Sequence, residues 1–152
     1  MGTVRRMTVL RLRRGERWSA TAPRWSTLSA VGWFSLSGAG YRFDRHFHDC
    51  SEYWAITEGR ARVAVGDDLF DVAPGDLVCT PAGVEHDIVL AYTDEVVLLF
   101  IEEPVPPGGT AGHRQRDPAS AWHHVPRAGT GQPPADGAPN ARGFRRGAAG
   151  TA

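Results

Sequence analysis

Polar and apolar residues alternate over short distances in the middle of the chain. Between Arg60 and Val65, arginines alternate with alanine and valine, the period of two expected of a strand with one buried face. Similar short runs are separated by turn signals such as Gly66-Asp67 and Pro74-Gly75. The predicted strands cover residues 31–37, 42–48, 53–57, 60–65, 69–72, 77–80, 86–91 and 95–101.

Residues 30–103 contain no sustained apolar period of 3.6, so long amphipathic helices are not expected there. Short strands at this spacing predict an all-β protein with an antiparallel sandwich or barrel. Residues 1–29 read as an N-terminal arm with a short strand at 7–13. Residues 104–152 are rich in Ala, Gly and Pro and are expected to be partly or wholly disordered. Within them, 112–127 could dock on the domain or be incidental.

The composition excludes several classes of protein. Basic and acidic residues balance at 17 each, which gives no support for nucleic-acid or membrane-surface binding. No apolar run approaches the roughly 20 residues of a membrane helix, and the N-terminus lacks the apolar core of a secretory signal. With only two cysteines, Cys50 and Cys79, we expect free thiols and a cytoplasmic protein. All basic residues are arginine, which is typical of a GC-rich genome.

Four residues form a candidate metal site. His46 and His48 are two positions apart, so they face the same side of a strand, and Glu52 shares their parity. His86 follows Pro81-Ala-Gly83 further along the chain. Imidazole and carboxylate groups are common ligands of divalent transition metals.

Two spaced motifs carry these residues. The first is Gly40, five residues, His46-x-His48, three residues, Glu52, six residues, Gly59. The second is Gly75, five residues, Pro81-x-Gly83, two residues and His86, with Leu90 four positions further on. Fifteen residues, 60–74, separate the motifs.

In both motifs the chain resembles the cupin superfamily, whose second motif has Asn at the position of Leu90. The resemblance implies a single-domain jelly-roll β-barrel, or double-stranded β-helix, over residues 30–103. It implies one divalent transition metal per chain, held by His46, His48, Glu52 and His86. Iron, manganese, nickel, cobalt, copper and zinc all suit such ligands. The resemblance also implies a homodimer paired through outer strands.

Strand parity predicts which other residues face the interior. Trp54, Ile56, Ile88 and Leu90 are expected to line an apolar substrate pocket, and the alternative for Trp54 is core packing. Glu85 and Asp87 have the opposite parity to His86 and are expected at the surface. Cys79 is expected to be a small buried hydrophobe, and Cys50 occupies a variable position of the motif.

The predicted function is a metal-dependent enzyme that acts on a small organic molecule inside the barrel. Single-domain members of the family include dioxygenases, cyclases, lyases and isomerases, and the resemblance does not choose among these reactions. A role in bacterial secondary metabolism would suit such an enzyme. The sequence identifies no catalytic residue besides the metal ligands. The alternative is a non-catalytic module that binds or senses a small metabolite or sugar. No partner other than this small molecule and a second copy of the chain is predicted.

Overall fold

The computed structural model describes residues 9–38 and 41–128 of the 152-residue chain. Strands dominate these residues, and the two α-helices among them are four residues long. The elements, in chain order, are α1 (Trp18–Thr21), β1 (Ala30–Ser37), β2 (Arg42–Asp44), β3 (Glu52–Glu58), β4 (Ala61–Val65), β5 (Asp68–Val72), β6 (Leu77–Thr80), β7 (His86–Ala91), β8 (Glu95–Glu102), α2 (Pro118–Ala121) and β9 (Trp122–His124).

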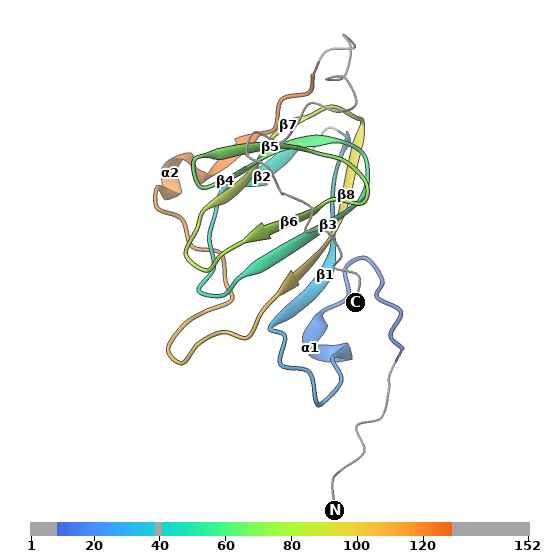
Figure 1. The fold of residues 1–152 in the computed structure, drawn as a ribbon, viewed down its shortest axis with the longest axis vertical. Helices are drawn as coiled ribbons and strands as arrows, with labels where there is room; N and C mark the ends of the chain where they lie inside the picture. Colours follow the sequence, from blue (N-terminus) through green and yellow to red (C-terminus); the bar gives the residue numbers. More distant parts are fainter. Residues whose placement is uncertain (1–8, 39–40, 129–152) are drawn as a thin grey trace, which may run out of the picture.

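The strands of the described residues are arranged in three sheets. The largest has the order β1-β8-β3-β6, the second has the order β5-β4-β7, and β2 pairs with β9. The named strand pairs are all antiparallel. In Figure 1 the strands of the first two sheets wrap around a common interior. Strands that are distant in sequence lie side by side, as β1 and β8 do.

The hydrophobic core lies between the sheets, because each strand turns its alternate apolar side chains inward. Leu36 of β1 and Leu98 of β8 are each 1% exposed, and Ile88 of β7 is fully buried. Val125, just after β9, is equally buried and belongs to the same cluster. The core therefore includes a residue from well beyond β8.

The turn between β3 and β4 depends on Gly59. Its φ of +77° lies in the left-handed region, which side chains other than glycine rarely adopt. An added Cβ would also overlap the backbone carbonyl oxygen of Glu95. This close approach lets the turn pack against the start of β8, which explains the glycine at this position of the first motif.

The segment after β8 runs along one side of the sheets and returns to them through α2 and β9, as the orange ribbon in Figure 1 shows. β9 pairs with β2 in the register Arg42 with His124. The backbone N–H of Val125 donates to the carbonyl oxygen of Tyr41 at 2.7 Å. Residues 112–127 thus dock on the domain, whereas the expected disorder of 129–152 lies outside the described residues.

The all-β prediction and the jelly-roll arrangement are confirmed, but the strands are divided among separate sheets and do not close one barrel. The predicted strand 42–48 ends at Asp44, and only isolated bridges follow at His46 and Phe47. The predicted strand at 7–13 is absent from residues 9–13, while residues 7 and 8 lie outside the described part. β9 has no counterpart among the predicted strands.

Candidate metal centre

Three histidines and one glutamate meet inside the fold. His46 and His48 lie in the link between β2 and β3, Glu52 begins β3, and His86 begins β7. His46 and His86 form an antiparallel bridge, in which the N–H of His86 donates to the carbonyl of His46 at 2.9 Å. This bridge joins the two sequence motifs directly. All four side chains are buried, with at most 5% of each residue exposed.

Each imidazole ring uses Nδ1 to contact a backbone carbonyl oxygen. Nδ1 of His46 contacts the carbonyl of Asp44, and Nδ1 of His48 contacts that of Ala111 at 2.8 Å. Nδ1 of His86 lies 3.3 Å from the carbonyl of Val84. A carbonyl only accepts hydrogen bonds, so Nδ1 carries the proton and the Nε2 lone pair stays free. All three rings are therefore in the tautomer that a metal ligand through Nε2 needs.

The Nε2 atoms of the three histidines and a carboxylate oxygen of Glu52 point toward a common centre. One ligand atom from each of the four residues lies within 4.8 Å of all the others. Nε2 of His86 is 3.1 Å from Nε2 of His46 and 2.8 Å from Oε2 of Glu52. Nevertheless, Oε2 of Glu52 and Nε2 of His48 have no hydrogen bond of acceptable geometry, although both are buried.

Buried lone pairs without a donor are costly, and a cation among them would satisfy all four. Three imidazole nitrogens and a carboxylate oxygen suit a divalent transition metal. The His/Glu cluster is thus compatible with a metal site in its donor types, tautomers and spacing.

The electrostatics of the cluster favour the unprotonated form of His46 and Glu52. For His48, burial would lower the pKa, but the Glu52 carboxylate outweighs it and raises the pKa of this ring. Burial lowers the pKa of His46 to about 3, and the neighbouring His86 adds to the effect. Burial alone would raise the pKa of Glu52, but His48 and His86 outweigh it and lower the pKa to about 2. Both groups therefore keep a free lone pair well below neutral pH, as metal ligands require.

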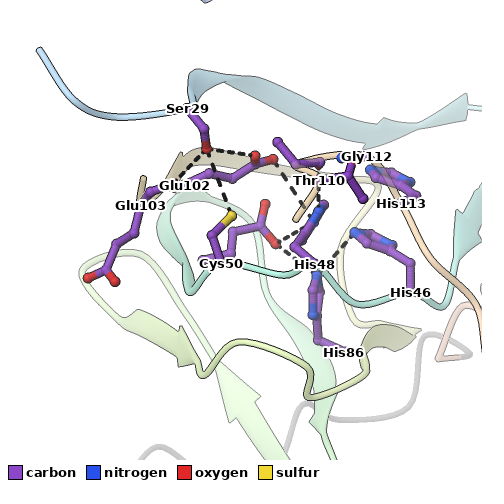
Figure 2. A network of polar contacts seen from close by, with 12 residues as sticks. Ser29, His46, His48, Cys50, His86, Glu102, Glu103, Thr110, Gly112 and His113 are labelled. Carbon is purple, nitrogen blue, oxygen red and sulfur yellow. Dashed lines mark hydrogen bonds and ion pairs between the residues drawn. The ribbon is translucent and has the colours of Figure 1, made fainter. Parts of the chain in front are cut away.

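A second carboxylate, Glu102 at the end of β8, lies beside this cluster (Figure 2). Its Oε1 is 4.0 Å from Nε2 of His48, and its Oε2 accepts a hydrogen bond from the Ser29 hydroxyl at 3.3 Å. Burial is the largest influence on Glu102 and raises its pKa, with Glu52 adding to the rise and His48 opposing it. Glu102 therefore places a second buried acidic group near the ligands.

A cavity of about 160 Å³ opens next to the cluster and is bounded by His46, Glu52 and Glu102. Most of its remaining wall is apolar and aromatic. These apolar lining residues are Phe34, Phe43, Trp54, Leu98, Phe100 and Trp122. An apolar cavity with a few polar groups at one end is typical of a site for a small organic molecule.

The four residues expected in the pocket have different locations. Trp54 lines the cavity, and its ring centroid is 5.0 Å from that of His86. Ile56 and Ile88 are buried in the hydrophobic core. Leu90 is half-buried and outside the cavity lining. The pairing of β4 with β7 shifts register at Val89, so the alternation that starts at His86 does not extend to Leu90.

Two expectations about neighbouring residues were wrong. Asp87 is 5% exposed and not at the surface, because His123 of β9 covers it and bonds to its Oδ1 at 2.7 Å. Cys79 is exposed, because β6 is an edge strand and Cys79 points to its outer face. Cys50 is buried close to Glu52, with its Sγ 3.8 Å from the Ser29 hydroxyl.

Two polar residues of the cavity, Glu102 and His113, lie outside both sequence motifs. Glu102 directly follows the predicted strand 95–101, and its even spacing from Val96 and Leu98 was a usable signal for a side chain that points inward. His113 comes from the Gly- and Pro-rich segment after β8, where no periodic pattern indicates its location.

The described residues contain no helix that is long and apolar enough to cross a membrane.

Comparison with known proteins agrees with this site and fold. The family model described as the cupin domain matches residues 32–102. The uncharacterized protein y4oW of Sinorhizobium fredii is 46% identical over 52 residues, which are 34% of this chain and 24% of that protein. The chain thus spans about a quarter of the length of this curated relative.

Solved structures are similar at low identity. The plu4264 protein of Photorhabdus luminescens has a TM-score of 0.50 and 19% identity, covering 68% of this chain and 88% of that one. A cupin protein from Bacteroides fragilis has a TM-score of 0.49 and 18% identity, covering 75% and 93%. The first of these supports a shared fold. With both motifs on one site and the family match over residues 32–102, the chain belongs to the cupin superfamily.

Proposed function

We propose that this protein is a metal-dependent enzyme that acts on a small organic molecule in the cavity beside His46, His48, Glu52 and His86. The observation that carries the proposal is the convergence of four buried ligand atoms, two of them without a hydrogen bond, at the edge of an apolar cavity. When bound, one divalent transition metal would supply Lewis acidity toward an oxygen atom of the substrate, or redox chemistry if it is iron.

The chain itself supplies positioning and exclusion of water. The backbone carbonyls of Asp44, Ala111 and Val84 orient the three imidazole rings. The aromatic wall around Trp54 and Phe100 binds the apolar part of the substrate and keeps water from it. Glu102 offers a carboxyl group close to the reacting end.

Metal binding is tested first. We expect metal-stripped, full-length protein to bind one Co(II) per chain, measured by visible absorption and elemental analysis. Glu52→Gln and His86→Ala should each weaken binding by at least about tenfold, since even residues behind the ligands contribute that much. His124→Ala, at an exposed histidine of β9, is the matched control and should bind normally. A wild-type protein that takes up no Co(II), Fe(II) or Zn(II) would contradict the proposal.

Turnover is tested next. Anaerobic reconstitution with Fe(II), followed by oxygen-uptake measurements over a panel of small organic acids, should identify a substrate if the chemistry is that of a dioxygenase. Conversion without oxygen uptake in the zinc or nickel form would favour a cyclase, lyase or isomerase. Saturable binding with no conversion in any metal form would instead favour a non-catalytic binding module.

We also propose that the protein is a homodimer in the cytoplasm. β6 is an edge strand of the largest sheet, and Leu77 on it is 56% exposed, so a second copy would cover an open edge and an apolar side chain. Cys50 and Cys79 are both free thiols, which suits a reducing compartment. Light scattering should give twice the chain mass, and Leu77→Glu should reduce it to the mass of one chain.

A further inference from the structure

A second group of polar residues lies at the cavity, in addition to the four candidate metal ligands. It consists of Asp44 at the end of β2 and of His113 and Gln115, which belong to the segment between β8 and α2. His113 and Asp44 both line the cavity. The segment lies beyond residues 32–102, so neither His113 nor Gln115 is part of the matched family domain.

The hydrogen bonds of this group define the state of His113. Nδ1 of His113 lies 3.0 Å from Oδ2 of Asp44. The side-chain amide of Gln115 donates to both carboxylate oxygens of Asp44, at 3.2 and 3.0 Å. Asp44 therefore acts as an acceptor, and the proton on the His113 ring lies on Nδ1. The Nε2 lone pair of His113 is then free to accept a hydrogen bond.

His113 is next to the metal ligands. Its ring stacks on the ring of His46 with the centroids 3.6 Å apart and the planes inclined by 6°. Figure 2 shows His113 close to His46 and His48. Asp44, His46 and His113 are also near enough together to suggest a separate metal site. However, Nδ1 of His46 contacts the Asp44 carbonyl and its Nε2 faces His86, so His46 has no nitrogen left for one.

The segment holds His113 firmly on both sides. Before it, the carbonyl of Ala111 contacts Nδ1 of His48. After it, Arg114 forms a two-way backbone bridge with Phe47, with N–O distances of 2.8 and 3.0 Å. The Arg114 guanidinium also donates to Asp49 at 2.6 Å. These contacts place the His113 ring between two anchored residues and leave little freedom to its backbone.

We propose that His113 contacts the molecule bound in the cavity, with Nε2 accepting a hydrogen bond from a donor group beside the metal-binding oxygen. Asp44 and Gln115 are positioning residues that hold the ring. The ligand class that satisfies this arrangement is a small molecule with a hydroxyl group next to the oxygen atom that binds the metal and an apolar remainder that fits the aromatic wall. This inference rests on the proposed function, since it requires a metal at His46, His48, Glu52 and His86.

The test compares two simple probes, lactate and propionate, which differ at the hydroxyl group. Dissociation constants for both are measured on the Co(II)-loaded, full-length protein by visible absorption. The intrinsic preference of cobalt for lactate is common to all variants, so the change in the affinity ratio isolates His113. We expect His113→Phe to lower the lactate-to-propionate affinity ratio by about threefold to tenfold, the effect of one neutral hydrogen bond.

Three controls support the comparison. His124→Phe, at an exposed histidine of β9, should leave the ratio unchanged. His113→Gln, whose amide oxygen can accept a hydrogen bond, should retain part of the preference. The Zn(II)-loaded wild-type protein gives a readout that needs no variant. There, the nitrogen-15 NMR signal of His113 Nε2 should shift with lactate and stay unchanged with propionate.

The outcomes separate the two proposals. If Co(II) binds but the affinity ratio is the same in wild type and His113→Phe, the role of His113 is overturned and the metal site stands. If His113→Phe does not fold, the NMR measurement on the wild-type protein tests the role of His113 instead. A nitrogen-15 signal of His113 Nε2 that does not shift when lactate is added overturns the inference. If the wild-type protein binds no Co(II), both the metal site and the His113 contact are overturned.

Discussion

Glu52 on β3 lies directly opposite Glu102 on β8 in the antiparallel register, and both carboxyl side chains are less than one-tenth exposed. Like charges in directly opposed positions destabilise a sheet. Buried away from water, the pair is costly unless a proton or a cation lies close to it. Repulsion between these two carboxylates therefore destabilises the metal-free fold at the place where the candidate ligands converge.

Glu102→Gln is expected to stabilise the metal-free protein by about 1 kcal/mol above neutral pH, because it removes one of the two opposed charges. The pKa of Glu102 is raised in the folded state, so the folded protein holds this proton to higher pH than the unfolded chain. The contribution of Glu102 to the stability of the wild type consequently decreases as the pH rises above about 4.5, and the variant lacks this loss.

Urea unfolding of the metal-free protein across this pH range measures the difference, which should grow as the pH rises. Glu58→Gln, at an exposed position that ends β3, is the control and should follow the wild type. A variant that loses stability relative to wild type with rising pH would contradict the opposition of Glu52 and Glu102.

Acid is expected to destabilise the metal-free protein through His46. Its pKa is about 3 in the fold against 6.5 for an unperturbed histidine, so the unfolded chain binds the proton first. Stability should thus decrease as the pH falls from about 6.5 toward 3, by up to about 1.4 kcal/mol per pH unit from this one group. Glu52, whose pKa is also lowered, adds a loss of the same sign below about 4.5.

The free energy of unfolding, measured against pH for wild type and His46→Asn, should show a shallower slope in the variant. His124→Asn should keep the slope of the wild type, since His124 is exposed. Identical slopes in wild type and His46→Asn would show that folding does not lower the pKa of His46.

Gly59→Ala is expected to destabilise the fold by more than about 3 kcal/mol, since it combines backbone strain with a steric overlap on the Glu95 carbonyl. Gly75→Ala is the matched control, because Gly75 has a φ of +98° but nothing within 4 Å of an added Cβ. It should cost only the strain, about 1 kcal/mol. Thermal unfolding of both variants provides the test, and equal losses would contradict the close approach at Gly59.

Val125→Ala is expected to destabilise the protein by about 2 kcal/mol, because Val125 is 1% exposed and belongs to the core formed by the strands. Val9→Ala is the control, since Val9 is fully exposed and should change stability little. Chemical denaturation of both variants measures the difference. A neutral Val125→Ala would mean that the segment after β8 does not belong to the cooperative unit.

Much of the fold and of the candidate metal centre was predictable, because it depends on local spacing. Alternation along short runs located β3 to β8 within a residue or two of each end. The two-residue spacing of His46 and His48 places both rings on one side of an extended segment. Glu52 and His86 were identified through the motif resemblance, and the structure brings them to the same place.

Other features depend on contacts that no local pattern encodes. A register shift at Val89 turned Leu90 away from the cavity, and such a shift depends on the partner strand β4. Asp87 is buried only because β9 returns to cover it, and His113 reaches His46 only because residues 111 and 114 are bonded to the link before β3. That segment has neither a helical nor a strand period, so its path follows from long-range hydrogen bonds and packing. Residue spacing therefore identified the four candidate ligands in advance, whereas the environment of those residues depended on how distant parts of the chain pack together.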